Sequence, residues 1–405
     1  MVKENRMRDP SSLGDAIDLA LDLPDWHRRH VVARAFLRAM PCIFSEPEPD
    51  TEQDNPVTQQ HLLNLYRAGL LLAVAAELGP VAADTESLER LRLPGEGARL
   101  DICISAKNAA RSAVVTTDFS TERCSELCLA DAFGAIAKYE SENDLDLNIT
   151  FRKVAGDAMR GDISASSNPE TLSVSNPLFS SLVVFPTMDR MFTGAGYPKI
   201  SSGRTAGPDF LSTKFWHDWY WGILAGEPLD WELQRRIALI DDAIWEAGPE
   251  AVAQEIERIE RLFDLEQEIA ALKDMLPLRS ALSSTSLIGD NGGPPLDDGV
   301  QRAVRGDFVL VWDQIEDLEA EIAKPEPSPG RLKTIAKTLW DVSLRIAAYC
   351  GGKIDLALTE ASKEAGKAVV KWGAPIAAAS LASQNESIQQ VAKAIWAFVK
   401  TLPPG

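Results

Sequence analysis

The sequence lacks the features that mark membrane-spanning and secreted proteins. Its 405 residues contain no run of about eighteen consecutive apolar residues, so an ordinary transmembrane helix is not expected. The N-terminus carries charged residues with no apolar segment behind them, and so no signal peptide is expected. The five cysteines are few, odd in number and scattered, which argues against a disulfide framework. Together these absences predict a cytoplasmic protein with reduced thiols.

Motifs for common enzyme chemistries are also missing. The four histidines form no H-E-x-x-H element. No G-x-x-x-x-G-K-[ST], G-x-G-x-x-G or G-x-S-x-G element is present, which excludes the usual nucleotide, dinucleotide and α/β-hydrolase sites. Cys124 and Cys128 lack the second pair of ligands that a zinc site needs. We therefore predict no metal and no cofactor.

Positive charge is scarce except near the C-terminus. The chain has 41 Lys and Arg against 60 Asp and Glu, a net charge of −19 that argues against a nucleic-acid partner. Residues 331–405 hold ten basic and five acidic residues, so this part carries +5 and the rest carries −24. Such asymmetry predicts a basic C-terminal module that contacts an acidic partner, an anionic membrane or the acidic part of the same chain.

Helical periodicity dominates the pattern of apolar residues. A content of 45% hydrophobic and 25% charged residues is typical of a globular protein, and apolar residues recur at helical spacing. The sequence predicts a mainly α, multi-helical fold with helical hairpins and an irregular central connection. The expected parts are an N-terminal helical domain (1–162), an irregular connection (163–214), an aromatic hinge with an acidic helical domain (215–282), a Gly/Pro linker (283–296) and a C-terminal helical domain with a basic amphipathic end (297–405).

Several local signals refine this expectation. The helix at 58–78 is hydrophobic nearly all round, which predicts that it is buried. Asp230 is a predicted N-cap, and the glycine pair at 351–352 is expected to end a helix. Helices are favoured at 99–117, although β-branched residues leave strands open there. The segment at 182–185 is open between helix and strand.

An aromatic stretch lies near the middle of the chain. Four of the ten tryptophans fall within residues 215–231. Here His217 and Asp218 form the most enzyme-like pair, because aspartate can orient histidine and aromatic walls can bind a sugar or a base. A hydrolase or transferase pocket at 216–218 is therefore one hypothesis. Because no nucleophile accompanies the pair, a packing hub at which two halves of the chain meet is favoured.

The C-terminal region carries the strongest functional signal. Lysines spaced four residues apart form a basic helical stripe, and tryptophans accompany apolar faces farther along. A basic amphipathic helix with tryptophan is typical of membrane-surface association. The alternative is packing on the acidic helices at 250–323. The predicted membrane- or partner-binding residues are Lys363, Lys367, Lys371, Trp372, Lys393, Trp396 and Lys400.

Segments in three parts of the chain resemble an uncharacterised family of bacterial hypothetical proteins. One, near the start, is Arg34-Ala-Phe-Leu-Arg-Ala-Met-Pro41, and two longer segments follow it. The first is Trp219-Tyr…Leu-Ala-Gly-Glu-Pro-Leu-Asp-Trp231-Glu-Leu…Ile-Ala-Leu-Ile240. The second is the linker Leu287-Ile-Gly-Asp-Asn-Gly-Gly-Pro-Pro-Leu296, in which aspartate stands where the family usually has histidine. The resemblance covers about half of the chain and implies helices around residues 99–160. It implies no known activity.

The leading functional prediction is a non-catalytic helical interaction protein whose basic C-terminal module engages a membrane surface or a protein partner. A bacterial stress or defence effector fits this design. The alternatives are the hydrolase or transferase described above and a self-assembling structural protein. The expected location is the cytoplasm, with peripheral contact at the inner membrane as a second option.

Overall fold

The computed structural model is mainly α-helical, as the sequence predicts. Of the described residues, 84% are helical and none lies in a strand. Residues 104–106 and 108 are helical, as favoured for that region, whereas 182–185 lie outside the described residues. The structure describes residues 17–18, 20–40, 56–81, 104–106, 108, 127–128, 130–132, 158, 161–162, 174, 214–279, 282, 298–363 and 373–403.

The chain divides into two compact units, Met1–Ile256 and Glu257–Gly405. The boundary falls inside helix α12 (Pro249–Met275), so the predicted domain at 215–282 contributes to both units. The predicted Gly/Pro linker at 283–296 lies outside the described residues.

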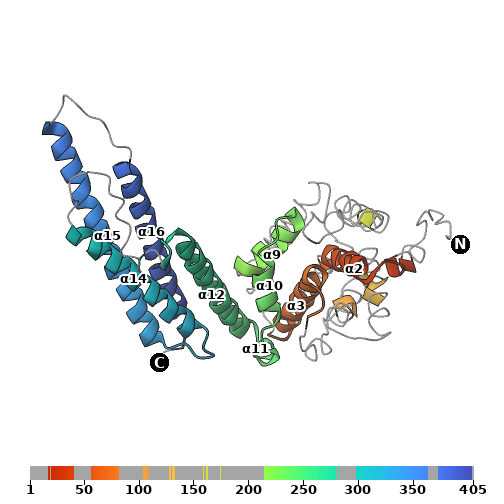
Figure 1. The fold of residues 1–405 in the computed structure, drawn as a ribbon. Helices are drawn as coiled ribbons and strands as arrows, with labels where there is room; N and C mark the ends of the chain where they lie inside the picture. Colours follow the sequence, from red (N-terminus) through yellow and green to blue (C-terminus); the bar gives the residue numbers. More distant parts are fainter. Residues whose placement is uncertain are drawn as a thin grey trace, which may run out of the picture. The chain divides into compact units, whose positions relative to one another are not determined.

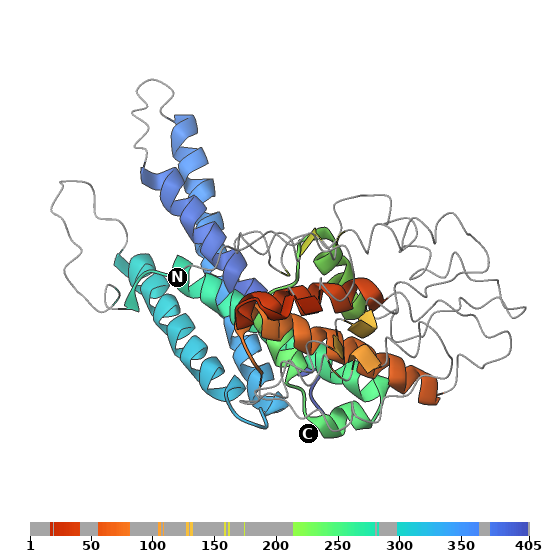
Figure 2. The same cartoon turned by 90° about the vertical axis from the view of Figure 1, so that its right-hand side faces the viewer.

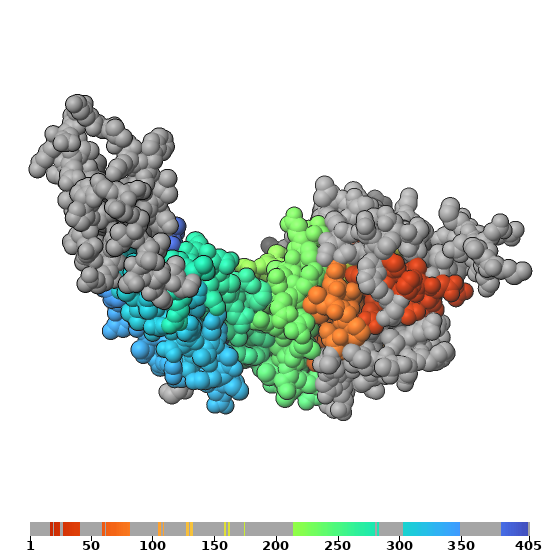
Figure 3. Space-filling model, viewed as in Figure 1, coloured from red at the N-terminus to blue at the C-terminus, as the bar shows by residue number. Residues whose placement is uncertain are grey.

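Unit 1 is organised around α3 (Pro56–Leu78). Residues 70–75 of this helix are fully buried, because neighbouring elements cover it on several sides, as its hydrophobic sequence predicts. Helices α2 (Asp25–Ala39) and α10 (Trp231–Ala238) pack against it. In the space-filling view, α3 (orange) lies between α2 (red) and the green surface of the segment that begins with α9 (Lys214–Ala225) (Figure 3).

Short turns join the helices that follow α9. The backbone N–H of Glu227 donates to the carbonyl of Gly222 at 2.7 Å, and a Cβ at Gly222 would lie only 2.6 Å from the carbonyl oxygen of Glu227. Only glycine therefore fits this turn without movement of the backbone. The side chain of Asp230 then accepts hydrogen bonds from the N–H groups of Glu232 and Leu233, which confirms the predicted N-cap. Helix α11 (Asp242–Glu246) is capped in the same way by Asp241.

Unit 2 combines the rest of α12 with three long helices. These are α14 (Asp298–Ile322), α15 (Pro329–Lys363) and α16 (Gly373–Val399). Leucine, isoleucine and valine side chains from all four helices form one buried core. Figures 1 and 2 both show α15 and α16 side by side as an antiparallel hairpin.

Helix α15 is longer than its sequence predicts. It continues through Gly351 and Gly352 to Lys363, although a helix-interior glycine costs about 1 kcal/mol relative to alanine. Pairing with α16 explains the difference, because packing between helices outweighs local propensity.

Candidate functional site

The aromatic residues of α9 form the packing hub of unit 1. Trp219 is fully buried, and its ring centroid lies 5.7 Å from that of Trp216 and 6.1 Å from that of Tyr66 on α3. The indole N–H of Trp219 donates to Oε1 of buried Gln234 at 3.0 Å, and the hydroxyl of Tyr220 donates to the carbonyl of Leu37 at 2.8 Å. This face of α9 therefore ties α2, α3 and α10 together.

A buried arginine completes the hub. The guanidinium of Arg67 lies 4.8 Å from the ring centroid of Trp245 and pairs with the carboxylate of Asp242. The Arg67 side chain is 1% exposed, so this charge depends on its partners within the fold. The arginine therefore fastens α3 to α11.

His217 and Asp218 lie on the other side of α9. The His217 side chain is 54% exposed, and its Nδ1 lies 3.2 Å from a carboxylate oxygen of Asp218. Lys214 donates to the second oxygen at 2.6 Å, and this hydrogen bond is the main reason that the pKa of Asp218 is lowered. Trp216, by contrast, points into the core. The structure thus brings His217 and Asp218 together but does not place Trp216 beside them in one pocket.

A different histidine, His30 on α2, is buried. Its Nδ1 accepts a hydrogen bond from the backbone N–H of Val174 at 3.3 Å, which requires that nitrogen to be unprotonated. Burial lowers the pKa of His30 below the ordinary value of 6.5; Arg34 and His27 lower it further, and Glu77 opposes them. The folded unit therefore holds the His30 imidazole in its neutral form.

The depressed pKa of His30 makes the stability of unit 1 sensitive to acid. Between the folded pKa and 6.5 the unfolded chain binds more protons, so stability is full above pH 6.5 and falls as the pH drops through that window. We expect the urea midpoint of unit 1 to be lower at about pH 5.5 than at about pH 7.5, and His30→Gln to reduce this difference. An unchanged pH dependence in His30→Gln would contradict this assignment.

The predicted C-terminal binding residues fall into two groups. Lys393, Trp396 and Lys400 are described, and both lysines are exposed. Lys363 is the last residue of α15, whereas Lys367, Lys371 and Trp372 lie outside the described residues. The ring of Trp396 packs against Trp340 of α15, with centroids 5.3 Å apart.

The apolar face of α16 is used within the bundle. Its fully buried side chains lie in the core shared with α12, α14 and α15. Helix α16 therefore presents its flanks, and not its main apolar face, to the outside. The buried residues are Ile388, Val391, Ala392, Ile395 and Phe398.

Trp340 and Trp396 each belong to a stripe of four side chains along one side of their helix. On α15 the stripe is Lys333, Lys337, Trp340 and Leu344; on α16 it is Gln389, Lys393, Trp396 and Lys400. In each helix the spacing of four, three and four residues places the four side chains along one side. Because the helices are antiparallel and the tryptophans touch, Lys337 lies toward Lys400 and Leu344 toward Lys393. We call these eight residues the basic face.

Lys333, Lys337, Trp340 and Leu344 were not among the residues predicted from the sequence. Their stripe is visible in the sequence of α15, but nothing in the sequence indicates that it adjoins the stripe of α16. Leu344 is 51% exposed.

Acidic residues of α14 do not neutralise the basic face. They pair with other cations, and among the described residues no carboxylate forms an ion pair with Lys333, Lys337, Lys393 or Lys400. The ion pairs of α14 include Asp307–Arg345, Asp313–Arg279, Glu316–Arg279, Asp317–Arg331, Glu319–Lys273, Glu321–Lys324 and Glu321–Arg331.

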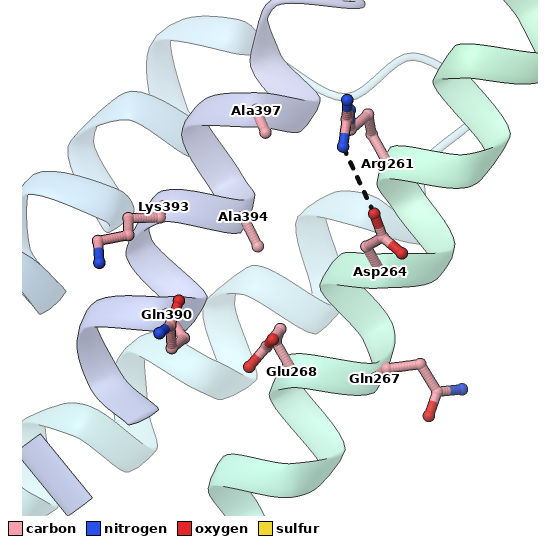
Figure 4. A pocket seen from close by; sticks show the side chains of 8 residues that line it. All are labelled: Arg261, Asp264, Gln267, Glu268, Gln390, Lys393, Ala394 and Ala397. Atoms are coloured by element: carbon pink, nitrogen blue, oxygen red, sulfur yellow. Dashed lines mark ion pairs between the residues drawn. The ribbon is translucent and has the colours of Figure 1, made fainter. Parts of the chain in front are cut away.

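A groove lies between α12 and α16 and adjoins the basic face at Lys393. Its volume is about 330 Å³, and Figure 4 shows Ala394 and Ala397 of α16 directed toward α12. The α12 wall carries the ion pair of Arg261 and Asp264, 3.6 Å apart. The remaining lining residues are Gln267, Glu268, Gln390 and Lys393.

Other site chemistries find no support among the described residues. No group of three or more histidine, cysteine, aspartate or glutamate side chains there is arranged to hold a metal ion. In the described part of the chain, every helix is too short or too polar to cross a bilayer.

Comparisons with known proteins add no assignment: no family model, curated protein or solved structure matches this chain.

Proposed function

We propose that this protein is a non-catalytic helical interaction protein that binds an acidic protein surface through the basic face of α15 and α16. The observation that carries the proposal is that no described carboxylate forms an ion pair with the four lysines of this face, although acidic residues abound in the same unit. The main alternative to partner binding was that acidic residues of the same chain pair with these lysines, and within the described part of the chain none does.

The composition of the basic face favours a protein partner. Interfaces between proteins commonly have an aromatic centre and a polar rim, and tryptophan often supplies much of the binding energy. Trp340 and Trp396 form such a centre, exposed Leu344 adds apolar area, and lysines surround them. We expect the partner to present carboxylates around a small apolar patch.

A membrane surface is the second kind of anionic partner. A helix that lies in a membrane interface inserts its apolar face among the lipids. In α16 that face is packed in the bundle core, so insertion would require the bundle to open. The lysines alone supply only electrostatic attraction, which salt screens. We therefore favour a protein partner in the cytoplasm and treat membrane contact as an outcome of the test.

Charge reversal tests this proposal. We expect the full-length protein to bind poly-L-glutamate at low ionic strength, measured by fluorescence anisotropy. The Lys333→Glu/Lys337→Glu/Lys400→Glu variant should bind about 30-fold more weakly, because attraction at three sites becomes repulsion. The matched Lys→Arg triple variant keeps the charge and should bind like the unmodified protein.

Two results would contradict the proposal. One is binding of poly-L-glutamate that is equal in the Glu and Arg variants. The other is lysine-dependent flotation with vesicles of phosphatidylcholine and phosphatidylglycerol without any binding of poly-L-glutamate, which would identify a membrane as the anionic surface.

A further inference from the structure

Charge is unevenly distributed along the basic face. Because α15 and α16 are antiparallel, Lys337 and Lys400 lie beyond the tryptophan pair in one direction, with Lys333 one turn farther (Figure 1). In the other direction the face continues past Lys393 toward the start of α16. There Glu386 is exposed and lies on the same side of the helix as Lys393, two turns away. One end therefore carries three positive charges, and the other end carries one charge of each sign.

Glu386 has no cation beside it among the described residues. Its carboxylate forms no ion pair there, and Lys393 is about 10 Å away along the helix axis. At such a distance salt largely screens the attraction between two exposed charges. A second acidic residue, Asp341, follows Trp340 but is rotated about 100° from it, outside the stripe of α15. The end of the face at Glu386 therefore presents an uncompensated carboxylate to a partner.

The two ends of the face are one helix length apart. Lys333 lies seven residues from Trp340, and Glu386 lies ten residues from Trp396 in the opposite direction along the bundle. At a rise of about 1.5 Å per residue, these ends are about 25 Å apart. That distance corresponds to about 17 residues of helix, so one helix of a partner can reach both ends.

We propose that the segment that binds the basic face is charge-segregated, with an acidic block, an apolar centre and a basic end, and that it binds in a single direction. Its carboxylates meet the three lysines at one end, its apolar residues meet the tryptophan pair, and its basic end meets Glu386. The opposite direction brings its acidic block to Glu386, where like charges repel. This inference rests on the proposed function, because it describes the partner of the same face.

Two peptides of the same composition test the charge segregation. One is about 17 residues long and has a glutamate block, a leucine centre and a lysine block, whereas the other distributes the same residues evenly. We expect fluorescence anisotropy with the full-length protein to show that the segregated peptide binds about tenfold more tightly, because only this peptide matches both ends of the face. Equal affinity of the two peptides would overturn the proposal.

Charge reversal at Glu386 should have opposite effects on two ligands. Glu386→Lys should weaken binding of the segregated peptide about fivefold and strengthen binding of poly-L-glutamate about threefold. The control Glu257→Lys makes the same change in net charge at an exposed residue outside both stripes, and it should change either affinity less than about twofold. Equal effects of the two substitutions on the segregated peptide would show that Glu386 does not contact it.

Photo-crosslinking determines the direction of binding. A benzophenone at the lysine end of the segregated peptide should label residues around Glu386, and one at the glutamate end should label residues around Lys333. Equal labelling of both regions from either end would overturn the single direction. Lysine-dependent binding of poly-L-glutamate without a preference for the segregated peptide would refute this inference and leave the proposed function standing, whereas loss of both would refute both.

Discussion

Trp219→Ala is expected to destabilise unit 1 by about 3–5 kcal/mol. Trp219 is fully buried among Trp216, Tyr66 and Tyr220, so its removal leaves a cavity that neighbouring helices cannot fill by small movements. Gly69 on α3 is part of the same fit: a Cβ there would lie 3.2 Å from the Trp219 ring. The loss also leaves Oε1 of buried Gln234 without its indole donor.

Two companion variants separate these causes. Trp219→Phe retains an aromatic ring but removes the donor to Gln234, and should cost about 1–3 kcal/mol. His217→Ala, on the exposed side of the same helix, should stay within about 0.5 kcal/mol. Hydrogen exchange measured on individual peptides shows whether the loss of stability is confined to unit 1. A small effect of Trp219→Ala, equal to that of His217→Ala, would show that α9 does not hold the unit together.

Ile395→Asp should destabilise unit 2 by at least about 3 kcal/mol. Ile395 is fully buried in the core that α16 shares with α12, α14 and α15. An aspartate there would be an unpaired charge in an apolar environment, and either its ionisation or its protonation costs free energy. Ile395→Val changes only the packing and should cost about 0.5–1.5 kcal/mol.

This variant also tests why a protein partner is favoured over a membrane. If α16 kept its apolar face free for lipid, Ile395→Asp would weaken vesicle binding and leave the chemical denaturation of unit 2 unchanged. We expect instead a large shift of the denaturation midpoint, which would place Ile395 in the bundle.

The helices were predicted from local sequence signals. The hydrophobic run at 58–78 correctly indicated a buried helix, and Asp230 correctly indicated a cap, because both depend on residues close together in the sequence. The prediction that the glycine pair at 351–352 ends a helix was wrong. Here the packing of α15 against a helix distant in the sequence outweighs the local cost of the two glycines. The separation of Trp216 from His217 follows from the rotation of about 100° between adjacent helical residues.

The candidate site depends on distant contacts, and only three of the eight residues of the basic face were predicted. Lys393, Trp396 and Lys400 stood out because they lie in the region of positive charge. Lys333 and Lys337 became part of the same face only when the contact of Trp340 with Trp396 fixed how α15 and α16 pair. The groove between α12 and α16 could not be predicted, because its walls are more than a hundred residues apart in the sequence.

The most direct test of the basic face compares lysine reactivity inside and outside the cell. Lysines are acetylated with a permeable reagent in intact cells that normally make the protein and, separately, in the purified protein, and each site is read by mass spectrometry. Lys333, Lys337 and Lys400 should be less modified in cells than in the purified protein, because a partner covers them. Lys324, which pairs with Glu321 and is not one of the residues of the basic face, should react equally in both and serves as the control. Equal reactivity of the three lysines in cells and in the purified protein would contradict the proposal that the basic face binds a partner.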